Sequence, residues 1–144
     1  TRIAGFYSTE DNRVWIHRGA GGSSTIIHEA IHLYSNHGAL SEFLNEGITE
    51  YFTQYVCEQL NIVAFGTYDI NVSVVRRIIR GLDRAGFDGR DVIAQAYFNG
   101  QFNHLVGAFE RSFGTHSWTR FSAAVGDDRR RLANTRVVNE IIGR

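Results

Sequence analysis

Lysine, methionine and proline are all missing from this sequence, and cysteine occurs once, at Cys57. A single cysteine cannot form a disulfide within the chain, so nothing in the sequence requires an oxidising compartment. Because Cys57 falls within the apolar run of an expected helix, we expect a buried and unreactive thiol. A sequence without methionine has no natural start, which indicates a fragment or the released part of a longer polypeptide.

The lack of lysine means that every basic residue is an arginine. A GC-rich genome could cause this bias, but the many Ile and Asn residues and the absence of proline fit that explanation poorly. The alternative is an effector or toxin domain that is secreted or delivered into another cell, where lysines would be attachment points for ubiquitin. We keep this second explanation as a hypothesis about the larger protein.

The sequence also has no excess of charge of either sign, since the formal net charge is +0. A neutral balance argues against nucleic acid or an anionic membrane as the main partner, because both favour a basic surface. No run of about 18 apolar residues predicts a transmembrane helix, and the N-terminus lacks the layout of a signal peptide. With 144 residues, we expect a single domain over 1–144 that is large enough for a hydrophobic core.

The most informative pattern that is present is HEAIH, at residues 28–32. On a helix, His28 and His32 project from one face one turn apart, so their imidazoles can bind one metal ion. Glu29 lies on the flank, where its carboxylate can polarise a water molecule at that metal. The same spacing also occurs by chance on solvated helix faces, so this pattern alone leaves both interpretations open.

A second pattern, NEGITE at residues 45–50, offers the third ligand that a catalytic zinc site needs. Glu46 is the natural candidate, and thirteen residues (33–45) separate it from His32. Glu50 lies one turn later on the same helix face and can accept a hydrogen bond from the outer nitrogen of a ligand histidine. An exposed acidic face is the alternative interpretation of these two carboxylates.

Together the two patterns resemble the gluzincin metallopeptidases, which join a His-Glu-x-x-His helix to a glutamate on a following helix. The resemblance implies that His28, His32 and Glu46 bind Zn²⁺, that Glu29 is the general base and that Glu50 supports a ligand histidine. The separation of the two motifs is shorter than in the better-known families. The metzincin pattern does not fit, because it requires Gly at 35 and His at 38, where this chain has Ser35 and Gly38.

A third segment, Tyr97-Phe98-Asn99-Gly100, resembles the Tyr-x-x-Gly segment of aminopeptidase-type gluzincins. That resemblance implies that the Tyr97 hydroxyl stabilises the oxyanion of the reaction. Tyr97 could equally be a core residue, and His104 and His116 are alternative donors for the same role.

The rest of the chain predicts a β-hairpin followed by helices. Strands at 5–7 and 14–16 flank the turn-forming cluster 8–12, and the hairpin could either cover the core or pair with an extended substrate. We expect a helix from about 25 through 34, with a serine N-cap and Gly38 as the C′ residue, and a second helix after the capping Ser41. Further helices are expected from 69 onward, at 88–98 and at 101–113, and two short helices in the tail are separated by residues 126–131.

Four arginines, at 76, 77, 80 and 84, lie mostly opposite the apolar side of the helix that begins at 69. Such a face could bind a phosphate or an acidic partner. With a net charge of zero, we favour a solvated face whose arginines pair with nearby acids.

These patterns predict an α+β fold of the zincin-like kind, with a small N-terminal antiparallel sheet followed by a mostly helical body. The expected function is that of a zinc-dependent metallopeptidase acting on a protein or peptide substrate, with the rest of a parent polypeptide as a further partner. The competing class is a non-enzymatic, zinc-stabilised module that binds peptide without cleaving it.

Overall fold

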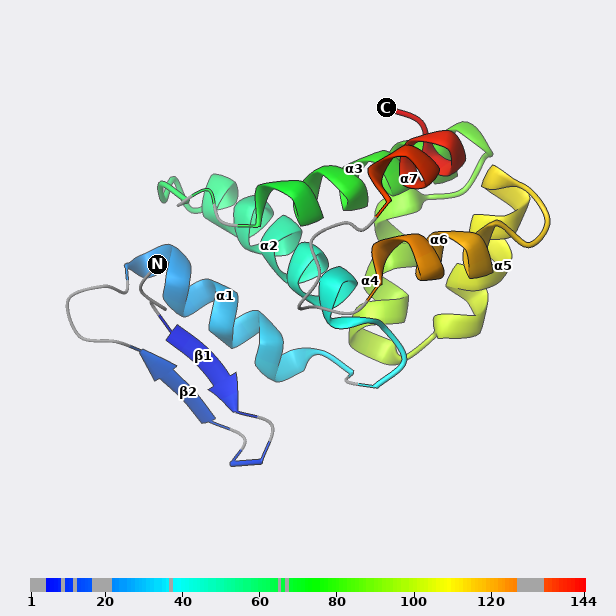
Figure 1. Cartoon of the computed structure of the whole chain (residues 1–144). Helices are drawn as coiled ribbons and strands as arrows, with labels where there is room; N and C mark the ends of the chain where they lie inside the picture. Colours follow the sequence, from blue (N-terminus) through cyan, green and yellow to red (C-terminus); the bar gives the residue numbers. More distant parts are fainter. Residues whose placement is uncertain are drawn as a thin grey trace.

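The computed structural model of this chain describes residues 5–8, 10–11, 13–16, 22–36, 38–64, 66, 68–126 and 134–144. Helices make up most of the described part (Figure 1). In chain order the elements are β1 (Gly5–Ser8), β2 (Arg13–Ile16), α1 (Ser23–Tyr34), α2 (Glu42–Gln59), α3 (Asp69–Arg84), α4 (Gly89–Asn99), α5 (Phe102–Phe113), α6 (Ser117–Val125) and α7 (Thr135–Ile142).

The expected fold class, α+β of the zincin-like kind with an N-terminal sheet, is wrong. The β-structure in the described residues is one antiparallel hairpin of two four-residue strands, with Gly5 opposite Ile16 and Ser8 opposite Arg13. The buried apolar cluster that forms the core runs from Leu40 to Ile142 and is built by the helices. The hairpin was correctly predicted as a local element, but the fold is a helical one, because the core residues that the structure describes lie on helices α2 to α7 or directly beside them.

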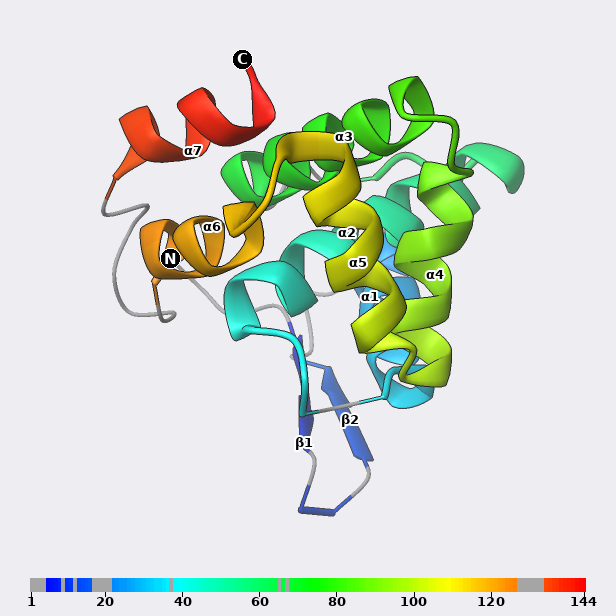
Figure 2. The ribbon, with the colours of Figure 1, turned by 90° about the vertical axis from the view of Figure 1, so that its right-hand side faces the viewer.

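The helices form a continuous series in which neighbours pack on one another. The hairpin lies against α1, α1 packs on α2, and α2 packs on α3 (Figure 1). Helices α4, α5 and α7 also pack on α3, and α6 lies between α5 and α7 (Figure 2). Helix α2 is therefore covered by α1 on one side and by α3 on the other, so side chains on its α1 side are screened from water.

Aromatic and branched side chains fill the space between these helices. Fully buried examples are Ile48 on α2, Val74 on α3, Tyr97 on α4, Phe109 on α5 and Phe121 on α6. Phe109 contacts the ring of Phe121, with ring centroids 5.2 Å apart. Burying side chains of this size stabilises the fold by about 1.5–3 kcal/mol each, so this core fixes the positions of α2, α3 and α4.

The ends of the helices differ from expectation mainly around α1. Helix α1 begins at Ser23 after Gly22 and has no side-chain cap, so the expected serine N-cap is wrong. It ends at Tyr34, where the Ser35 hydroxyl donates to the carbonyl of His32 at 2.8 Å. The expected extent of the helix through residue 34 is therefore confirmed, but its C-cap is Ser35, so Gly38 is not the C′ residue.

The expected cap of α2 is confirmed, because the Ser41 hydroxyl accepts a hydrogen bond from the backbone nitrogen of Leu44 at 3.3 Å. Cys57 on α2 is buried as expected, and burial raises the pKa of its thiol. None of the helices in the described ranges is both long and apolar enough to cross a membrane.

Candidate metal centre

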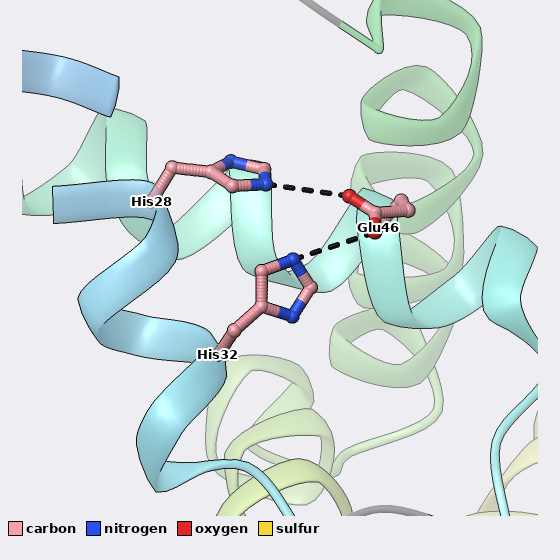
Figure 3. A group of neighbouring side chains, drawn as sticks. All are labelled: His28, His32 and Glu46. Carbon is pink, nitrogen blue, oxygen red and sulfur yellow. Dashed lines mark hydrogen bonds and ion pairs between the residues drawn. The ribbon is translucent and has the colours of Figure 1, made fainter. Parts of the chain in front are cut away.

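Helix α1 places two imidazoles on the side that faces α2. His28 is buried and His32 is partly buried, and their ring centroids lie 4.9 Å apart with the planes inclined at 69°. This is the arrangement expected of side chains one helical turn apart. Both rings point across the helix interface toward α2 (Figure 3).

Helix α2 places the carboxylate of Glu46 opposite the two rings (Figure 3). His28 Nε2 lies 3.3 Å from Glu46 Oε2, and His32 Nε2 lies 3.4 Å from Glu46 Oε1. One ligand atom from each of the three residues lies within 4.8 Å of the others. In a tetrahedral zinc site with bonds of about 2.0–2.1 Å, ligand atoms are about 3.4 Å apart, so this donor set fits a zinc ion.

The outer nitrogen of each imidazole also has a partner on α2. His28 Nδ1 donates to Glu50 Oε2 at 2.8 Å, and the side chain of Glu50 is only 2% exposed. His32 Nδ1 lies 3.4 Å from Thr49 Oγ1, which in turn donates to the carbonyl of Asn45 at 2.6 Å. A proton held on each Nδ1 leaves the Nε2 lone pair free, which is the tautomer that a metal-binding imidazole needs.

The pKa values of two groups in this cluster, His28 and Glu46, are strongly shifted in the metal-free protein. Burial opposes a charge on His28, but hydrogen bonds to Glu46 and Glu50 raise its pKa to about 9. Burial also disfavours the Glu46 carboxylate, but hydrogen bonds from His28 and His32 lower its pKa to about 2. Without a metal, the cluster is therefore held together by an ion pair between His28 and Glu46.

Glu29 is buried beside this cluster, on the same helix as both histidines. It is 5% exposed, and its Oε2 atom has no hydrogen-bond partner among the residues that the structure describes. Burial raises the pKa of Glu29, although the nearby charges of His28 and His32 act in the opposite direction. A buried carboxylate oxygen without a partner is costly and is suited to receive a proton from a molecule that enters the site.

Tyr97 does not reach the ligand atoms in the way the resemblance implied. Its side chain is fully buried, and its hydroxyl donates to Thr49 Oγ1 at 2.6 Å. Burial raises the pKa of Tyr97 to about 12. Tyr97 therefore contacts His32 only indirectly, through Thr49. This placement agrees with the interpretation of Tyr97 as a core residue.

The two alternative histidines lie in the part of the chain that forms α5 and α6. His104 on α5 and His116 just before α6 are both exposed. Helix α5 packs mainly on α3, α4 and α6, while α1 packs mainly on the hairpin and α2. The structure therefore does not bring either histidine to the metal cluster.

Tyr68 is a site residue that sequence reasoning missed. Its ring stacks on His28, with centroids 5.6 Å apart and planes inclined at 13°. Burial raises the pKa of its hydroxyl, and both the charge of Glu46 and a hydrogen bond to that carboxylate add to the effect. Its left-handed backbone (φ 56°, ψ 36°) just before α3 directs it to the site, and the sequence carries no motif for this position.

Comparisons with protein-family models, with curated protein sequences and with solved structures found no match to this chain. The fold and the site thus define a mainly helical protein with a candidate metal centre of two histidines and one glutamate. Any functional conclusion depends on the geometry of that centre.

Proposed function

We propose that this chain is a zinc-dependent metallopeptidase. The observation that supports it best is the convergence of His28, His32 and Glu46, whose ligand atoms lie within 4.8 Å of one another. The buried, unpartnered Oε2 atom of Glu29 lies on the same helix as both histidines. A cluster that combines metal ligands with a proton acceptor is typical of a hydrolytic site, whereas a purely structural metal site has no need of the acceptor.

His28, His32 and Glu46 would hold the metal ion, and Glu50 and Thr49 would hold the two imidazoles in the required orientation. Zinc bound there would lower the pKa of water to about 7 and polarise the carbonyl of the substrate. The donor set of two nitrogens and one carboxylate leaves a fourth position, as catalytic zinc sites do.

Glu29 acts as the general base in this proposal. Its Oε2 atom accepts a proton from the water whose oxygen forms the new bond to the peptide carbonyl carbon. The same oxygen then delivers the proton to the leaving nitrogen as the carbon–nitrogen bond breaks. The raised pKa of Glu29 makes its carboxylate a stronger base, so it takes the proton of the water more readily and holds it until the nitrogen leaves.

Tyr68 replaces Tyr97 as the donor to the developing oxyanion. Its hydroxyl contacts Glu46, and its side chain is 45% exposed, so it can meet a substrate. The hairpin strands next to α1 offer backbone groups for pairing with an extended peptide. The substrate is accordingly a protein or peptide segment bound in an extended form.

The deciding experiment compares the wild type with Glu29→Gln. We expect the variant to bind zinc with unchanged stoichiometry in native mass spectrometry, and to cleave a peptide library about 10²–10⁴-fold more slowly. Glu110→Gln on α5 is the matched control and should cleave at the wild-type rate. Equal cleavage by wild type and Glu29→Gln would show that Glu29 is not the base.

A second function is a zinc-stabilised module that binds peptide without cleaving it. The observation in its favour is Tyr68, which covers His28 and contacts Glu46 and so could close the metal site. The variant Tyr68→Phe separates the two functions. An enzyme should lose about 10²–10³-fold in kcat with little change in zinc affinity. A binding module should show no turnover in either form while the wild type still retains zinc.

We also propose that this chain acts as part of a larger protein that is secreted or delivered into a target cell. The support is compositional, since all fifteen basic residues are arginine. A lysine-free domain resists ubiquitin-dependent degradation. Replacing several exposed arginines by lysine should therefore shorten its half-life in a eukaryotic cytosol, and an unchanged half-life would contradict this proposal.

A further inference from the structure

A pocket lies away from the metal centre, where α2, α3 and α4 meet. Its volume is about 360 Å³, and the side chains that line it include Tyr51, Gln54 and Tyr55 from α2, Arg76 and Arg80 from α3, and Arg90 from α4. A volume of this size lies within the range of pockets that hold small molecules.

The arginines of this pocket have no carboxylate partners among the described residues. The ion pairs there join the two site histidines to Glu46 and Glu50, and join Arg120 and Arg136 to Glu140. The expectation that the α3 arginines pair with nearby acids is therefore wrong. No ion pair within the described ranges neutralises these arginines, and the charge of Arg80 contributes to a lowered pKa of its neighbour Arg77, after the larger effect of burial.

Neutral groups hold two of the three guanidinium groups in place. Arg90 Nε donates to the Tyr51 hydroxyl at 3.0 Å, and the Arg90 guanidinium lies 4.6 Å from the centre of the Tyr55 ring. Arg76 Nη2 donates to Gln54 Oε1 at 2.7 Å. These contacts fix the guanidinium groups without neutralising them, which reduces the entropy lost when an anion binds.

The charge of the pocket matches a doubly charged anion. Three arginines and one acid, Glu58, line it, so its formal charge is +2. A phosphomonoester carries close to two negative charges at neutral pH and has three acceptor oxygens, which guanidinium groups bind in a bidentate manner. We propose that this pocket binds the phosphate group of a small phosphorylated molecule.

Calorimetric titration of the metal-free full chain tests this proposal independently of zinc and of peptidase activity. The probes are inorganic phosphate, O-phosphoserine and succinate. We expect saturable binding of one equivalent of a phosphate compound and at least tenfold weaker binding of succinate. Tighter binding of O-phosphoserine would identify a phosphomonoester as the ligand, and tighter binding of inorganic phosphate would identify the free ion; both outcomes support a phosphate site.

Variants show whether binding belongs to this pocket. Arg80→Gln and Arg90→Gln should each weaken phosphate binding at least tenfold. The matched control Arg84→Gln, which removes a charge from the same helix outside this pocket, should change it less than twofold. Thermal melts confirm that each variant is folded. Equal weakening by all three variants, equal binding of succinate, or no binding at millimolar phosphate would overturn the proposal.

Discussion

At the scale of single residues, Glu50 shows how the site is held in shape. Its side chain is 2% exposed, and each carboxylate oxygen has a partner: His28 Nδ1 at 2.8 Å and Gln54 Nε2 at 3.4 Å. Burying a carboxylate is costly unless such partners are present. The buried Glu50 carboxylate is therefore explained by its effect on His28, because it fixes the imidazole tautomer that leaves Nε2 free.

We predict that Glu50→Gln weakens zinc binding by about 10–100-fold, which is the usual cost of losing such a partner. The amide keeps the shape of the side chain but accepts the His28 proton less strongly. Competition with a chromophoric chelator measures the effect. Glu58→Gln, an exposed position on the same helix, should leave zinc affinity unchanged. Equal affinity of Glu50→Gln and the wild type would mean that Glu50 does not orient His28.

The sequence indicated the candidate ligand residues because each pair within one helix has a local geometry. His28 and His32 share one helix face because they are four residues apart, and the same spacing places Glu46 and Glu50 on one face of their helix. Tyr68 and Tyr97 depend instead on how helices far apart in the chain pack. Tyr97 reaches Thr49 across the contact between α4 and α2, and Tyr68 reaches His28 from the start of α3. No spacing rule within the chain encodes such contacts.

At the scale of helices, the close packing of α2 on α3 fixes the position of α2, and with it the position of Glu46. Gly47 lies at this contact, where a Cβ atom would stand 2.9 Å from the backbone oxygen of Asn71 and 3.0 Å from Val75 Cγ2. The Asn71 side chain also donates to the carbonyl of Phe43 at 3.0 Å. The glycine that follows the proposed ligand is thus required by packing.

We predict that Gly47→Ala destabilises the metal-free protein by about 1–3 kcal/mol, because the added methyl group forces α2 away from α3. Zinc affinity should fall as well, since Glu46 moves with α2. Gly107→Ala is the matched control: nothing lies within 4 Å of a Cβ atom there, and this exposed helical site should gain about 0.5–1 kcal/mol. Chemical denaturation measures both changes. A Gly47→Ala protein as stable as the wild type would contradict this account of the interface.

The positions of the helices were predicted more accurately than the fold class. Helix α3 begins at Asp69 as expected, and its buried side includes Val72, Val74 and Ile78. The hairpin was predicted from its turn cluster, yet a local turn does not determine whether a strand gains further partners. In the described part of the chain the hairpin packs on α1 and remains two-stranded, so the core is helical.

At the scale of the whole molecule, the charged cluster between α1 and α2 links folding to pH. The pKa of His28 is raised from 6.5 to about 9 in the folded metal-free protein. Its contribution to stability is therefore fully present below about pH 6.5 and is lost as the pH rises through about 9. Glu46, with its pKa lowered to about 2, contributes above pH 4.5 and loses that contribution as the pH falls through about 2.

We predict that the metal-free protein is most stable between about pH 4.5 and 6.5 and loses roughly 1–3 kcal/mol of unfolding free energy between pH 6.5 and 9. Zinc should have the opposite dependence, because protons compete with the metal for His28: the stabilisation it adds should grow over the same range. Urea denaturation at pH 5.5, 7.5 and 9, with a chelator or with saturating zinc, measures both slopes. His28→Gln should flatten the metal-free slope, and His104→Gln, at an exposed position on α5, should preserve it. A metal-free protein that gains stability from pH 6.5 to 9 would show that the ion pair between α1 and α2 does not hold these helices together.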